Sequence, residues 1–249
     1  MSGGTAKSTS YASGALASLA SKHTDNRTAI AKRLVGLLNA RGAERAVRVL
    51  GALAELSFDN AANQVAIAKA GGIPLIVSWL GSLSVAAQTE AAHALLAIAS
   101  DNASTQQLVV RFAGIPPLIT IIAKSSSEKA KEHAARALWH LASSAEVQTT
   151  ITSEGGVPPL VGMLSAGGIQ APELAAITIV RLAANNPTTS QRIADVGGIG
   201  PLCRLLTNGS SHAQQQAVKA QAALRALEEG GELSGIEWEA LTKELELAT

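Results

Sequence analysis

The chain has 249 residues and a formal net charge of +1, and 47% of its residues are hydrophobic whereas only 2% are aromatic. The apolar fraction is too high for a disordered chain, and a balanced charge argues against a protein dedicated to the phosphate backbone of nucleic acids. So few aromatic side chains also argue against a stacking surface for single-stranded nucleic acid, and we expect no nucleic-acid partner. Alanine is the commonest residue, which favours helices that approach one another closely.

The sequence lacks two features that are typical of secreted proteins. The single cysteine, Cys203, cannot form an internal disulfide, and the start of the chain has no secretory apolar segment. We therefore expect an intracellular protein in the cytoplasm, with the nucleus or a larger assembly as the alternative locations. Its longest apolar stretches are interrupted before the ~20 residues that a membrane span requires, so we expect no direct membrane insertion.

Four segments of similar sequence recur at a constant spacing. Each contains a glycine pair, or Ala-Gly in one copy, shortly before a proline, and the second glycines stand at positions 72, 114, 156 and 198, which are 42 residues apart. A short helical pattern precedes each pair, and glycine ends it because glycine tolerates the left-handed conformation. Proline then opens a second short helix, and a longer alanine-rich helix closes the unit. The sequence therefore predicts an all-α fold built from repeated three-helix units.

This unit resembles the armadillo repeat in its length, in the Gly-Gly-Ile-Pro segment between its first two helices, and in an Ala-Leu-x-x-Leu-Ala third helix such as 137–142. The resemblance covers nearly the whole chain. It implies a right-handed α-solenoid, a superhelix in which neighbouring repeats share one continuous core. It also implies a binding scaffold, although a fold with many unrelated clients does not specify which one.

In chain order, we expect one solenoid over residues 1–249. It begins with an incomplete repeat at 1–25, which matches only a closing helix, and a shortened repeat at 26–58, which lacks the Gly-Gly-Ile-Pro segment. The regular repeats are expected at 59–101, 102–143, 144–186 and 187–229. Residues 230–249 are expected to form an acidic capping helix, because the end of a solenoid needs a polar outer face.

Charge is distributed unevenly along the chain. Residues 1–70 hold nine Lys or Arg and four Asp or Glu, whereas seven Glu and one Lys follow from residue 228 onward. Such a polarised rod could associate head to tail or laterally with other copies. The alternative is that these charges are simply solvated on exposed faces.

The resemblance implies that the third helices line a concave groove. In nuclear-import receptors, a ladder of Asn side chains in this groove holds an extended peptide, and a Trp lies one turn before each Asn. Here the Asn positions hold Glu55, Ala97, His140, Arg181 and Ala226. The Trp positions hold Gly51, His93, Arg136, Ile177 and Ala222. Because both ladders are absent, we do not expect this chain to bind basic nuclear-localisation peptides in that way.

The central part of the predicted groove carries titratable, cationic and aromatic residues. We expect the partner-binding residues to be His93, His133, Arg136, Trp139, His140 and Arg181. Trp and Arg are common binding hot spots, and the cations favour an acidic or phosphorylated segment of a protein or peptide. The alternative is that Trp139 packs between helices and that the charges are merely solvated.

Catalysis and metal binding have little support in the sequence. His133 and His140 share a helix face, but a metal site needs three or four converging ligands, and no motif for phosphate or cofactor binding occurs. We therefore expect no enzyme, no metal and no cofactor. The predicted function is a non-catalytic interaction scaffold that binds a partner along its groove. The alternative is a structural subunit, or a fragment, packed permanently in a larger assembly.

Overall fold

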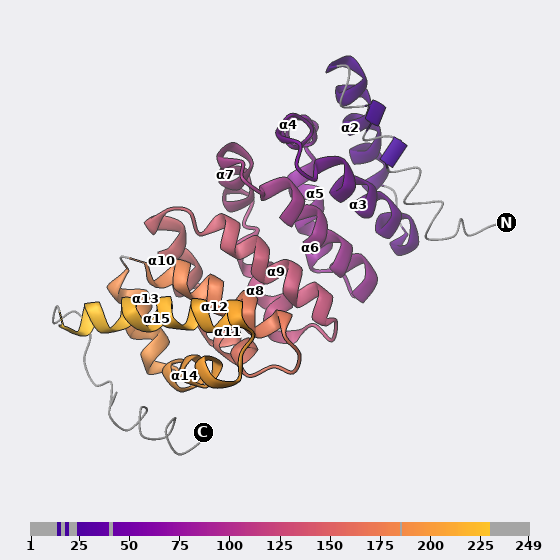
Figure 1. Cartoon of the computed structure of the whole chain (residues 1–249). Coiled ribbons are helices and arrows are strands. Elements are labelled where there is room, and N and C mark those ends of the chain that lie inside the picture. The colour runs from indigo at the N-terminus through magenta and orange to yellow at the C-terminus, as the bar shows by residue number, and fades with distance from the viewer. Residues whose placement is uncertain (1–13, 16–17, 20–23, 40–41, 185, 230–249) are drawn as a thin grey trace. The chain divides into compact units, whose positions relative to one another are not determined.

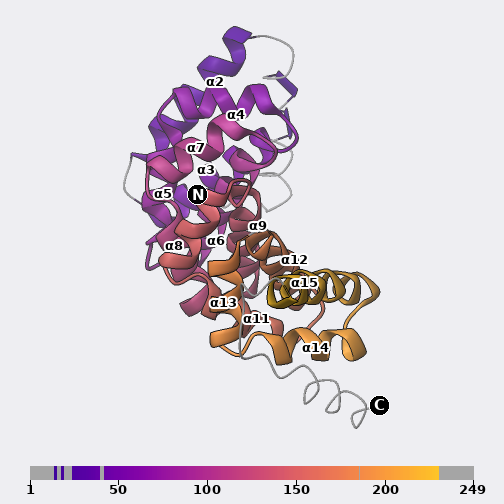
Figure 2. The same cartoon turned by 90° about the vertical axis from the view of Figure 1, so that its left-hand side faces the viewer.

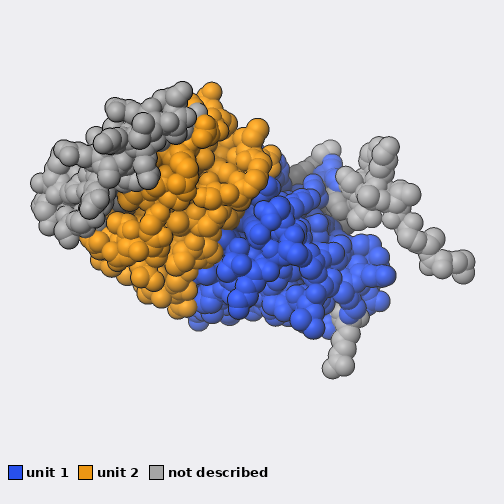
Figure 3. Space-filling view, turned by 90° about the horizontal axis from the view of Figure 1, so that it is seen from below, with its two compact units in different colours: residues 1–141 blue, residues 142–249 orange. Residues whose placement is uncertain are grey.

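The computed structural model describes residues 14–15, 18–19, 24–39, 42–184 and 186–229, and this part of the chain is helical and contains no strand. The prediction of an all-α fold is therefore confirmed. The described chain divides into two compact units, residues 1–141 and 142–249, which Figure 3 colours separately. The acidic tail at 230–249 lies outside the described residues, as does most of the N-terminal segment 1–25.

Unit 1 holds eight described helices that have a label in Figure 1. They are α2 (Thr24–Leu38), α3 (Ala43–Ser57), α4 (Ala61–Lys69), α5 (Gly72–Leu80), α6 (Val85–Ala99), α7 (Ala103–Arg111), α8 (Ile115–Lys124) and α9 (Glu128–Leu141). Helix α2 is continuous where a regular repeat has two short helices, since no Gly-Gly-Ile-Pro segment interrupts it. The described helices of unit 2 are α10 (Ala145–Ser153), α11 (Val157–Leu164), α12 (Gln170–Ala183), α13 (Pro187–Asp195), α14 (Ile199–Asn208) and α15 (Ser211–Glu229).

Each of the ranges 59–101, 102–143, 144–186 and 187–229 contains two short helices and one longer helix. Within unit 1, the long helices α3, α6 and α9 lie side by side, and the short helices α4 and α7 are also neighbours (Figures 1 and 2). Within unit 2, the long helices α12 and α15 are in contact. Equivalent helices of successive repeats therefore pack against each other inside each unit, as in a solenoid.

The two glycines between the first and second helices have different roles. The first one, as at Gly71, Gly155 and Gly197, has a φ between 74° and 80°, a left-handed conformation that favours glycine. The second one has no room for a side chain: a Cβ at Gly72 would lie 2.7 Å from Ile67 Cγ2. The pair therefore combines a sharp turn with a close approach of the second helix to the first.

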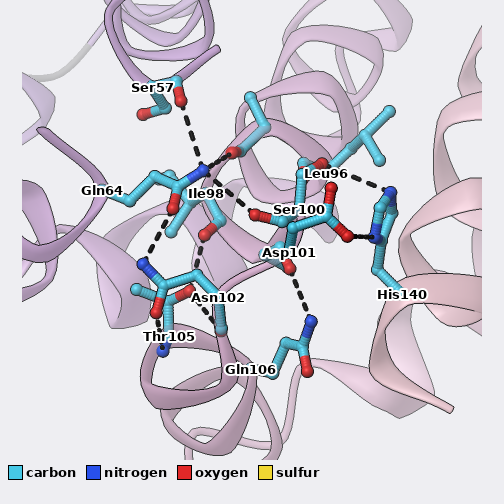
Figure 4. A network of polar contacts seen from close by, with 12 residues as sticks. Ser57, Gln64, Leu96, Ile98, Ser100, Asp101, Asn102, Thr105, Gln106 and His140 are labelled. Carbon is cyan, nitrogen blue, oxygen red and sulfur yellow. Dashed lines mark hydrogen bonds and ion pairs between the residues drawn. The ribbon is translucent and has the colours of Figure 1, made fainter. Parts of the chain in front are cut away.

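The carboxyl ends of the long helices are bonded by side chains that follow the same 42-residue spacing. Gln64 Nε2 donates to the carbonyl oxygens of Ser57 (3.3 Å), Ala97 (2.9 Å) and Ser100 (3.2 Å). Gln106 Nε2 donates to Ala99 O at 2.9 Å in the next repeat. Asn102 Nδ2 links the two repeats by donating to Gln64 Oε1 at 2.8 Å (Figure 4). These bonds satisfy carbonyl groups that a helix end leaves without an intrahelical partner.

Alanine allows the long helices to pack closely. Its side chain is fully buried at Ala91 and Ala94 of α6 and at Ala134 and Ala137 of α9. Larger apolar residues of the second helices, such as Ile76 of α5 and Leu118 of α8, are also fully buried, and Cys203 of α14 is buried as well.

No single described helix is long and apolar enough to cross a membrane. The joined pair α7 and α8, bent by 81° at the break between them, passes such a test by length and composition alone.

The glycine pair gives a first testable prediction, because the second repeat has Ala113 where the other repeats have the left-handed glycine. Ala113 has a φ of 54°. An alanine in the left-handed conformation costs roughly 1–2 kcal/mol of stability relative to glycine. Glycine, in turn, loses more conformational entropy on folding, which costs about 0.5–1 kcal/mol relative to alanine. We therefore expect Ala113→Gly to stabilise the protein by about 0.5–1 kcal/mol in urea unfolding. A decrease in stability would contradict this account of the turn.

The neighbouring residue is expected to behave in the opposite way. A Cβ at Gly114 would lie 2.6 Å from Val109 Cγ1 and 3.0 Å from Val109 O. Gly114→Ala should therefore destabilise the protein by about 1–3 kcal/mol, the usual cost of overpacking. The same urea series measures both variants, and equal effects of the two substitutions would show that the glycines do not have separate roles.

The core is tested in unit 2, where Leu160 and Leu202 are both 0% exposed. Leu160→Ala or Leu202→Ala should lower the free energy of unfolding by about 2–5 kcal/mol, because each removes buried methyl groups and leaves a cavity. The exposed Val218 of α15 provides a control, since Val218→Ala should change stability by less than about 0.5 kcal/mol.

Candidate functional site

A pocket of about 270 Å³ opens beside the three long helices of unit 1. Phe58, Leu96 and Ala97 supply its apolar lining. Its polar lining consists of Asp59, Ser100 and Asp101, the histidines His93, His133 and His140, and Arg136. The pocket thus draws on the end of α3, the second half of α6 and one face of α9.

Short loops after the long helices place the two aspartates. Asp59 follows α3 and Asp101 follows α6, and both have a left-handed backbone, with φ of 51° and 52°. Aspartate tolerates this conformation better than most residues do. The next residue in each case, Asn60 or Asn102, caps the following helix with its side-chain oxygen. The sharp turn therefore leaves each aspartate at the mouth of the pocket.

Two stacked histidines form one wall. The rings of His93 on α6 and His133 on α9 have centroids 4.6 Å apart and an interplanar angle of 13°. His93 Nδ1 lies 3.5 Å from Glu90 Oε2, and the hydrogen bond from His93 lowers the pKa of Glu90. Glu90 Oε2 also lies next to α3, since a Cβ at Gly51 would be in ordinary van der Waals contact with it at 3.4 Å.

His133 is neutral at physiological pH. Burial lowers the pKa of this imidazole to about 4, and the positive charges of His93 and Lys129 act in the same direction. Its Nε2 atom is buried and has no hydrogen-bond partner within the described chain. A charged His133 would be costly here, so this imidazole offers the pocket an uncharged aromatic ring.

His140 lies at the other end of the pocket. Its Nε2 is 3.4 Å from Ser100 Oγ and its Nδ1 is 3.8 Å from Asp101 Oδ1 (Figure 4). Trp139 contacts the edge of the same ring, with centroids 4.6 Å apart and an interplanar angle of 79°. These contacts from α6 and α9 hold the imidazole in place.

Arg136 is the fixed positive charge of the pocket. It is exposed on α9, and within the described chain it has no ion-pair partner. Lys129, also exposed, lies seven residues earlier and therefore on the same face of this helix. This face of α9 therefore carries two cations, Lys129 and Arg136, with Glu132 between them, whereas Asp59 and Asp101 make the loop side anionic.

Four of the six predicted site residues line this pocket: His93, His133, Arg136 and His140. Trp139 is half-buried against His140 and does not line it. Arg181 is half-buried on α12 of unit 2, and its part in binding stays a prediction.

The sequence analysis did not select Phe58, Asp59, Ser100 and Asp101. A signal was available, because Phe58 and Ser100, like Asp59 and Asp101, occupy equivalent positions of two repeats 42 residues apart. The described chain contains no group of three or more His, Cys, Asp or Glu side chains arranged to hold a metal ion.

Comparison with known proteins agrees with this architecture. The profile of the Armadillo/beta-catenin-like repeat matches residues 102–143. An engineered protein of known structure is 30% identical to the chain, with a TM-score of 0.78, and the match covers 90% of this chain and 92% of that one. The chain belongs to the armadillo repeat family. No curated protein matches it.

Two further structures share the armadillo fold. A designed armadillo repeat protein in complex with the peptide (KR)4 is 23% identical, with a TM-score of 0.76, over 86% of this chain and 92% of that chain. Computationally designed armadillo repeat proteins for modular peptide recognition are 22% identical, with a TM-score of 0.75, over 84% of this chain and 90% of theirs. In this armadillo protein, the pocket includes two Trp positions, His93 and Arg136, and two Asn positions, Ala97 and His140, of the peptide-binding ladder.

The environment of His133 predicts a particular dependence of stability on pH. Its folded pKa of about 4 lies below the ordinary value of 6.5, so the unfolded chain binds more protons between these pH values. Stability should therefore fall as pH is lowered from about 6.5 to 4, and His133→Gln should reduce this fall. An NMR titration of the His133 ring provides the direct check, and a midpoint near 6.5 would contradict the proposed burial.

Proposed function

We propose that this armadillo protein is a non-catalytic scaffold that binds a partner polypeptide at the pocket of unit 1. The observation that carries the proposal is the coincidence of this pocket with four ladder positions: His93, Ala97, Arg136 and His140. A pocket at that place offers a partner side chain an enclosed contact where related proteins hold the peptide backbone. The designed relatives, described as binding or recognising peptides, support a polypeptide as the partner.

The charges favour an acidic or phosphorylated segment along α9. Arg136 can form charge-assisted hydrogen bonds with a carboxylate or phosphate, and Lys129 adds to the positive potential of the same face. His133 contributes no charge near pH 7 because of its low pKa. Asp59 and Asp101 would repel an anion on the loop side, so the anionic group is expected beside Arg136.

Binding is best tested with three pools of fluorescent synthetic peptides: acidic, phosphorylated and basic. We expect the full chain to bind the acidic or phosphorylated pool more tightly than the basic pool, with an affinity that decreases as salt is added. Arg136→Glu should weaken this binding by about tenfold or more, because a hydrogen bond to a charged group contributes roughly 1.5–3 kcal/mol.

The matched control is Arg111→Glu on α7, which reverses the charge of an exposed arginine outside the pocket. This variant should bind like the unaltered chain. Equal losses for both variants would indicate a general charge effect, and a preference for basic peptides would contradict the proposed class of partner.

A further inference from the structure

Phe58 gives the pocket an exposed aromatic surface. Phe58 follows the last residue of α3, and its side chain is 71% exposed. Aromatic residues are rare in this chain, so an exposed one is unusual here. Leu96 and Ala97 of α6 lie at the same pocket and are nearly fully buried, so they provide an apolar base. Exposure of this apolar surface to water is unfavourable, so covering it with an apolar side chain of a partner stabilises the complex.

The pocket has the size of one large side chain. Its volume of about 270 Å³ is smaller than the roughly 300–1,000 Å³ of pockets that hold drug-sized ligands. The imidazoles of His93 and His133 and the ring of Phe58 line the same pocket, and they suit an aromatic partner group because aromatic rings prefer stacked or edge-to-face contacts. An aromatic side chain also loses little conformational entropy when it is bound.

The charges beside this aromatic surface limit which partner residues can stand next to the bound aromatic side chain. Arg136 faces the pocket from α9, whereas Asp59 lies on the α3 side next to Phe58. A partner with a carboxylate on the α9 side is attracted, and one with a carboxylate on the α3 side is repelled. Helix α6 lies between α3 and α9, so the two outer helices are about two helix spacings, or roughly 16–20 Å, apart. An extended chain advances about 3.3 Å per residue and covers this distance in about five or six residues.

We propose that the pocket recognises an extended segment in which an aromatic side chain enters beside Phe58 and an acidic residue, within about six positions of it, contacts Arg136. This inference rests on the proposed function, because it assigns the chemistry of the partner to the same pocket. The segment binds in one direction, with its acidic residue toward α9.

The test is a selection of peptides from a random library displayed on phage, carried out on the full chain. Parallel selections use Phe58→Ala and Arg136→Glu, and the matched control is Arg111→Glu combined with Phe112→Ala. Arg111 and Phe112 are an exposed cation and aromatic pair at the end of α7, outside the pocket. The expected result is a consensus of one aromatic and one acidic residue on the full chain and on the control, and its loss on both pocket variants.

Affinities of the synthetic consensus peptide then test each contact. Phe58→Ala and replacement of the peptide aromatic by alanine should each weaken binding by about tenfold, and the two changes together should cost less than their product because they remove one contact. Exchanging the charges, with Arg136→Glu against a peptide in which lysine replaces the acid, should recover part of the lost affinity. Circular dichroism checks that each variant retains its helices.

The outcomes separate this inference from the proposed function. Selection of acidic peptides that lack an aromatic residue would overturn the inference. Selection of peptides rich in lysine and arginine, which Phe58 and Asp59 would favour, would also overturn it. In both cases peptide binding itself stands. Binding that Phe58→Ala leaves unchanged also overturns it. If no peptide is enriched on the full chain, the proposed function fails as well.

Discussion

The second glycine of each regular repeat lies against the end of the first helix, and the position of the longer helix depends on this contact. At Gly72, Gly114 and Gly198 a Cβ would lie within 2.8 Å of a branched side chain of the preceding helix. The glycine before it, or Ala113 in one repeat, turns the chain through a left-handed conformation. Together they fix the angle at which the second helix leaves the first, and the third helix follows from there.

Because this turn recurs every 42 residues, equivalent helices meet equivalent helices within each unit. Small alanines let the long helices approach, and glutamine side chains such as Gln64 and Gln106 satisfy the carbonyl groups at their ends. The repetition thus provides a regular frame with its polar groups bonded. A site that distinguishes one partner from another requires residues that break the regularity.

The pocket of unit 1 is such an irregular place. It arises where successive repeats hold residues of different size and charge: a small Ala97, a stacked pair of imidazoles at His93 and His133, and a charged Arg136. Arg136 on α9 and Asp59 after α3 occupy different sides of it, which gives the pocket a direction, while Asp101 lies 3.8 Å from His140 Nδ1 on the α9 side. Burial lowers the pKa of His133 and keeps this imidazole uncharged at neutral pH, whereas the guanidinium of Arg136 is always charged.

The sequence by itself determined the helical class, the family and the period of the repeat, because glycine, proline and alanine act through local backbone preferences that are readable along the chain. It also indicated four residues of the pocket, since helical spacing places His93, His133, Arg136 and His140 on the predicted groove face. Only the tertiary structure decided that Phe58, Asp59 and Asp101 join them and that Trp139 packs against His140. The physical reason is that a pocket is made by loops and helices of different repeats, whose distances depend on packing and which no local pattern records.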